Sequence, residues 1–129
     1  MNYYFSKTVD YTFDQVIEKI TEELKKEGFG ILTEIDVKET FKKKLDVDFR
    51  KYKILGACNP QMAYQAIQHE PRIGTMLPCN VIVQELENGK VEVSAVDPVA
   101  SMQAVKNDKL GEIAKEVRTK LQTVIENLQ

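Results

Sequence analysis

The residues with the greatest chemical potential in this sequence lie between Leu55 and Asn80. The dipeptide Cys-Asn occurs twice there, once where a β-prone segment ends and once where another begins. If these two segments are neighbouring strands, both thiols and both amides meet near one end of a sheet. Polar groups gathered among apolar residues are typical of a ligand pocket. We therefore predict a ligand-binding site formed by Cys58, Asn59, Pro78, Cys79 and Asn80.

Several of these residues also have a purely structural explanation. Cysteine behaves as a small hydrophobic side chain when it is buried, so Cys58 and Cys79 could be core residues without any chemistry. Asn59, followed by a proline, is a strong signal for the start of a helix. Asn80 and Gly56 are harder to explain, because both residue types are disfavoured inside strands. A glycine there suggests that another backbone or a ligand approaches closely.

A thiol-redox or transition-metal site is the alternative interpretation. Cys58, Cys79 and His69, which is the one histidine in the chain, could supply three ligands. Their spacing matches no paired-ligand zinc motif, so we assign no metal ligand. A nucleophilic cysteine would need an activating base, and only His69 could be one. No dinucleotide-binding, phosphate-loop or zinc-protease motif is present, so the sequence indicates no catalytic residue, enzyme class or cofactor.

Hydrophobic periodicity predicts the elements that would position this site. Five segments are β-prone or alternate between apolar and polar residues: 2–8, 29–37, 52–58, 79–86 and 90–96. The dipeptide Asn88-Gly89 predicts a hairpin between the last two. Two amphipathic helices are expected, one after Thr12 and one over about 108–128, with short helices near 36–45, after Asn59 and after Asp97. This pattern predicts an α+β fold with a single antiparallel or mixed sheet and helices packed on one face.

Two finer predictions concern side-chain placement. Five alternating residues should share the half-buried face of the second strand: Phe29, Ile31, Thr33, Ile35 and Val37. Phe41 and Leu45 should pack along one face of the short lysine-rich helix that follows.

Length and composition limit the class of protein. A chain of 129 residues with 43% hydrophobic and 29% charged residues suits one globular domain, spanning 1–129. Eighteen basic and twenty acidic residues give a net charge of −2, which argues against non-specific nucleic-acid binding. No segment has the pattern of a secretory signal or a membrane span. With two cysteines and no disulfide framework, we expect reduced thiols and a cytoplasmic location.

Four sequence blocks carry a family resemblance: Gly28–Val37, Tyr52–Pro60, Ile73–Val81 and Val96-Asp97-Pro98. Together they resemble the domain of unknown function 302 family (DUF302) over nearly the whole chain. The resemblance implies a TATA-box-binding-protein-like (TBP-like) topology, β-α-β(4)-α with short extra helices, and a homodimer. It implies no activity, and a shared fold does not carry DNA binding with it. The aromatic run Tyr3-Tyr4-Phe5 is a candidate edge or interface strand for such a dimer.

Overall fold

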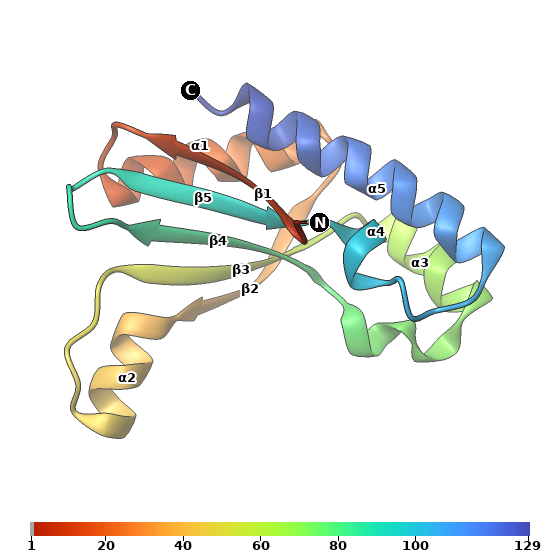
Figure 1. Cartoon of the computed structure of the whole chain (residues 1–129), viewed down its shortest axis with the longest axis horizontal. Coiled ribbons are helices and arrows are strands. Elements are labelled where there is room, and N and C mark those ends of the chain that lie inside the picture. The colour runs from red at the N-terminus through yellow and green to blue at the C-terminus, as the bar shows by residue number, and fades with distance from the viewer. Residues whose placement is uncertain (1) are drawn as a thin grey trace.

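The computed structural model describes residues 2–129, which form one sheet and a layer of helices (Figure 1). All pairs in the five-stranded sheet are antiparallel, in the order β1-β5-β4-β3-β2. This arrangement confirms the predicted α+β fold with a single sheet. The elements in chain order are β1 (Tyr4–Val9), α1 (Phe13–Lys26), β2 (Gly30–Asp36), α2 (Val37–Leu45), β3 (Tyr52–Cys58), α3 (Pro60–His69), the 3-10 helix η1 (Pro71–Met76), β4 (Cys79–Glu85), β5 (Val91–Val96), α4 (Pro98–Ser101) and α5 (Asp108–Asn127).

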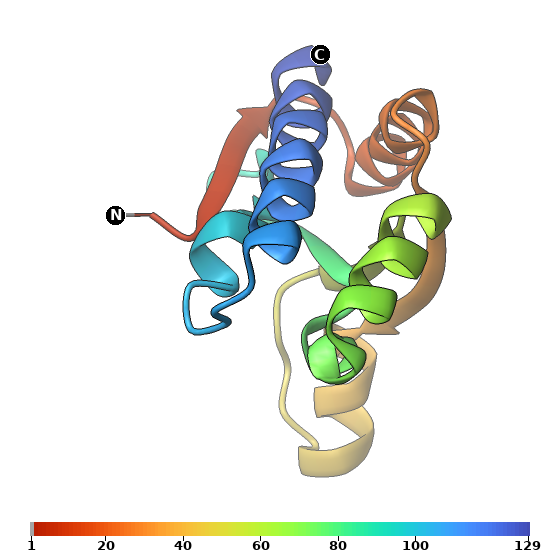
Figure 2. The same ribbon diagram turned by 90° about the vertical axis from the view of Figure 1, so that its right-hand side faces the viewer.

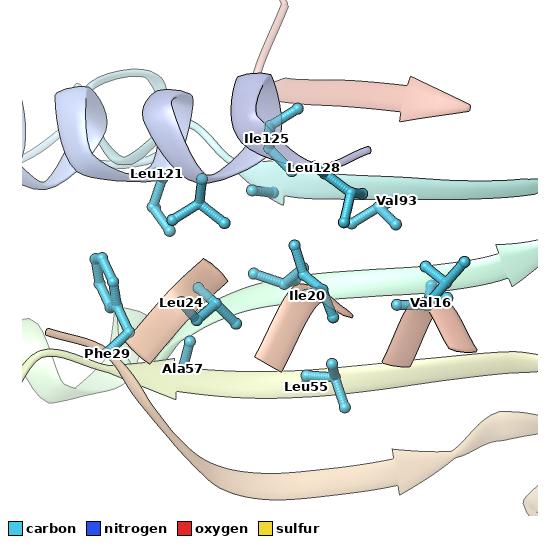
Figure 3. Packing of buried hydrophobic residues seen from close by; sticks show 14 of the residues in the cluster. Val16, Ile20, Leu24, Phe29, Leu55, Ala57, Val93, Leu121, Ile125 and Leu128 are labelled. Atoms are coloured by element: carbon cyan, nitrogen blue, oxygen red, sulfur yellow. The ribbon is translucent and has the colours of Figure 1, made fainter. Parts of the chain in front are cut away.

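The core lies between the sheet and the two long helices. Val16, Ile20 and Leu24 form the buried stripe of α1, at helical spacing. Figure 3 shows Leu121 of α5 pointing toward this stripe and Ile125 pointing toward β1, and both belong to the same buried cluster. Burial of apolar surface on this single face is therefore the main stabilising contribution to the fold.

Local signals fix where the elements begin and end. The Thr12 hydroxyl accepts from the Gln15 amide at 3.2 Å, and the Gln15 side chain accepts from the Thr12 amide at 3.0 Å, which is a complete capping box. Gly28 ends α1 with a φ of +85°, a conformation that glycine adopts without a Cβ clash. Gly89 has a φ of +84° in the β4–β5 hairpin. All three features follow from residues within a few positions of one another in the sequence.

The alternating residues predicted for the second strand do not all share one face of β2. The prediction is wrong for the residues after Leu32. Ile31 pairs with Ala57, but Thr33 pairs with Gly56, so β2 holds one extra residue at this point. A single-residue bulge reverses the facing of every side chain that follows it. Ile35 consequently lies on the face of the sheet away from the helices and is 48% exposed.

The short helix α2 also differs from its prediction. Asp36 caps it as expected, accepting from the Glu39 amide at 3.0 Å. Phe41 is half-buried against the Phe49 ring, with centroids 5.1 Å apart, but Leu45 is 65% exposed. Figure 1 shows α2 extending away from the layer that contains α1 and α5. No residue of α2 is buried, so this helix contributes little to the core.

Among residues 2–129, no helix is both long and apolar enough to cross a membrane.

Replacing Leu121 with alanine should lower the free energy of unfolding by about 2–5 kcal/mol, because a buried leucine leaves a cavity when it is truncated. The matched control is Leu45→Ala, which removes the same atoms from an exposed position and should change stability by less than about 0.5 kcal/mol. Urea denaturation of both variants measures this difference. If both variants lost the same free energy of unfolding, the conclusion that the core lies only between the sheet and the long helices would be contradicted.

Candidate functional site

An apolar pocket of about 290 Å³ lies between the ends of β3 and β4 and the helices α3, α4 and α5. Two buried clusters meet there. The main cluster lies under α1 and α5, the smaller one contains Ala66, Ile73 and Leu110, and Ile113 packs against both. Figure 2 shows α5 running past the sheet to the level of α3. The pocket is the space left where the helices diverge from the sheet.

Four of the five predicted ligand-binding residues line this pocket: Cys58, Asn59, Pro78 and Cys79. Cys58 ends β3 and is half-buried, whereas Cys79 begins β4 and is buried. Cys79 pairs across the sheet with Ala57, the residue that precedes Cys58. The two strands are therefore neighbours, and both thiols are free.

The environment of Cys79 disfavours its ionisation. Burial, with a smaller contribution from the neighbouring Cys58, raises the pKa of the Cys79 thiol to about 11. At neutral pH the Cys79 side chain is thus a protonated thiol, which is a poor nucleophile.

Asn59 has two structural tasks at the edge of the pocket. Its side-chain oxygen accepts from the Met62 amide at 3.3 Å, which caps α3 as the sequence predicts. Its side-chain nitrogen donates to the carbonyl oxygen of Glu27 at 3.4 Å, at the end of α1. A Cβ on Gly28 would lie only 3.1 Å from this nitrogen, so the glycine also makes room for the amide. The Asn59 amide therefore joins two helices.

Gly56 is explained by side chains of the protein itself. A Cβ at this position would collide with the Thr33 hydroxyl and would lie 2.7 Å from Cγ of Pro78. The Leu77–Pro78 peptide bond is cis. The sequence suggested another backbone or a ligand at this position, whereas the atoms that approach Gly56 belong to two side chains, those of Thr33 and Pro78.

Asn80 lies on the other face of the sheet. It is exposed, while its neighbours Cys79 and Val81 are buried beneath the helices. Successive side chains of a strand alternate between faces, so the adjacency of Cys79 and Asn80 already indicated this separation. Asn80 lines a shallow hollow of about 480 Å³ together with Tyr52 and Gln84. Within residues 2–129, its side-chain amide has no hydrogen-bond partner.

His69 lies outside the pocket, exposed at the end of α3. Its carbonyl oxygen accepts from the Asn107 side chain at 3.0 Å. Across the described part of the chain, no group of three or more His, Cys, Asp and Glu residues is placed to hold a metal ion. The donor set Cys58, Cys79 and His69 is thus not assembled.

Sequence reasoning missed the helical walls of the pocket. Met62 of α3 and Met102 after α4 line it, as do Leu110 and Ile113 of α5. Leu110 and Ile113 belong to the apolar stripe of α5, whose periodicity predicted a helix but not its place beside the pocket. The exposed residues Leu32 and Ile67 also line the pocket.

The family model described as "Domain of unknown function DUF302" matches residues 5–128. The chain therefore belongs to this family, as the sequence blocks indicated. It is also similar to a solved structure, an uncharacterized conserved DUF302 protein from Bacillus stearothermophilus, with a TM-score of 0.90 and 29% sequence identity over 98% of each chain. No curated protein matches the chain. The family and the shared fold come without an assigned activity.

Between pH 9 and 11, the folded protein should lose roughly 2–3 kcal/mol of stability through Cys79 alone. The thiol ionises near pH 9 in the unfolded chain but near 11 in the folded one, so rising pH favours unfolding across this window. Denaturation of wild type and Cys79→Ala at several pH values isolates this effect. Cys58→Ser should retain most of this loss of stability, since burial contributes more than Cys58 does to the raised pKa of Cys79. Parallel curves for wild type and Cys79→Ala would contradict the assignment.

Proposed function

We propose that this protein binds a small, uncharged and largely apolar molecule in the pocket between β3, β4, α3 and α5. The observation that carries this proposal is the lining of the pocket, which contains no charged residue. Asn59 is the one amide in the lining, and its polar atoms already cap α3 and bind Glu27. Affinity would therefore come from the burial of apolar surface rather than from ion pairs.

The volume of the pocket limits the size of the ligand. An apolar cavity of about 150 Å³ holds benzene, so a pocket of about 290 Å³ suits a molecule about twice as large, such as one with two fused rings. Leu32 is 68% exposed and Ile67 is 45% exposed, and both line the pocket on its solvent side. A polar group at one end of the ligand could therefore remain in water.

Binding of 2-naphthol, followed by its fluorescence, tests this proposal. Ala63→Phe should weaken binding by about tenfold or more, because Ala63 lines the pocket and a phenyl ring would occupy it. The matched control is Gln65→Phe, which places the same ring on the exposed side of α3 and should bind as wild type does. No saturable binding to wild type, or equal binding to both variants, would refute the proposal.

We also propose that two copies associate through the sheet face opposite to the helices. Ile35, Ile54 and Ile82 lie on this face without a covering helix, and Tyr4 is exposed at the β1 edge of the sheet. A sheet face with this apolar content gains stability when another layer covers it. A second copy would supply that layer by a self-complementary contact.

Light scattering after size exclusion, at tens of micromolar protein, measures this association. Ile35→Lys should shift the dimer toward monomer, because a charge would be buried in the contact. Gln122→Lys, on the exposed side of α5, adds the same charge on the opposite face and should leave the dimer intact. A monomeric wild type would rule the dimer out.

A further inference from the structure

Four sulfur-containing side chains line the apolar pocket: Cys58, Cys79, Met62 and Met102. They come from β3, β4, α3 and the end of α4, so only the folded chain brings them together. We propose that the pocket binds a soft monovalent metal ion, copper(I), through the two cysteine sulfurs with support from the thioethers of Met62 and Met102. This inference rests on the pocket of the proposed function, although it does not require the organic ligand.

The composition of the lining selects the class of metal. No histidine, aspartate or glutamate lines the pocket, and the Asn59 amide is already hydrogen-bonded. Magnesium and calcium require oxygen ligands, and zinc sites need three or four nitrogen, sulfur or carboxylate ligands. Thiolate and thioether sulfurs favour copper(I), which is stable with as few as two of them. A set of candidate donor atoms that consists only of sulfur therefore favours copper(I) over zinc.

The structure changes the donor set that the sequence suggested. His69 is exposed, does not line the pocket, and lies at the far end of α3 from Cys58. Met62 belongs to the first turn of the same helix, next to the cap residue Asn59. Thioethers therefore take the place of the imidazole, and the expected metal changes from one that accepts nitrogen to one that prefers sulfur.

The two thiols are neighbours across the β3–β4 pair. Cys79 lies opposite Ala57, the residue that precedes Cys58, and both cysteines line the same pocket. Copper(I) would displace one proton from each thiol to solvent, without a change in oxidation state. The resulting complex carries one negative charge. The N-terminus of the ten-residue helix α3, which begins directly after Cys58-Asn59, favours that charge.

Transfer of copper(I) from its bicinchoninate complex tests the site. Under anaerobic conditions the reduced wild type should remove one copper per chain from the chelator, measured as loss of the coloured complex. Cys58→Ser should weaken copper binding more than about 100-fold, because it removes a direct ligand. Loss of a residue that only supports a ligand typically weakens binding by about 10- to 100-fold. Met62→Leu and Met102→Leu, which conserve volume, should each weaken it by about tenfold. His69→Ala is the matched control and should bind as wild type does.

A second measurement guards against unfolded variants. Circular dichroism reports whether each variant folds, and the half-buried Cys58 is the safer thiol to replace than the buried Cys79. X-ray absorption of the copper-loaded wild type should show sulfur alone in the first shell. Failure to take copper from the chelator, equal loss in His69→Ala and Cys58→Ser, or a shell of nitrogen or oxygen would overturn the copper site.

The two proposals for this pocket fail separately. If 2-naphthol binds metal-free protein but copper(I) is not taken up, the copper site is wrong and the apolar-ligand function stands. If copper(I) is taken up and 2-naphthol does not bind, the apolar-ligand function is wrong and the copper site stands.

Discussion

Burial of one face of the sheet under α1 and α5 is the interaction on which the other features of this protein depend. Val81 and Val93 in the central strands are inaccessible to solvent, and Ile20 and Leu121 of the two helices are equally buried against them. Because α5 is twenty residues long, it continues beyond the sheet to α3 and α4. The pocket forms beside the part of α5 that extends beyond the sheet. The second consequence is that the opposite face of the sheet stays uncovered, because both long helices lie on one side.

Much of the fold could be predicted because its boundaries are set by neighbouring residues. β3 and the start of α3 follow from Asn59 and Pro60, which stop a strand and begin a helix within two positions. The facing of β2 after Leu32 could not be predicted, since the bulge arises from pairing with β3 rather than from the β2 sequence. Leu45 was misplaced for a similar reason: its periodicity is helical, but no element lies over that side of α2.

The sequence predicted where the candidate site lies, but it did not predict all the residues that line it. Two Cys-Asn pairs at strand ends indicated where β3 and β4 would meet, and Cys58 and Cys79 line one pocket there. Met62 and Met102 carry no comparable signal, because their closeness depends on how α3 and α4 pack against α5. Asn80 belongs to a different surface, which strand alternation alone was enough to indicate.

The pairing of β1 with β5 has a consequence for the order in which this chain can fold. Tyr4 is matched with Val96, whereas β2, β3, β4 and β5 each pair with a strand that is next in sequence. On a ribosome that adds about 5–20 residues per second, β1 must wait several seconds for its partner strand. Residues of α5, and Leu128 directly after it, then complete the core. During that interval, the apolar stripe of α1 lacks the cover of α5.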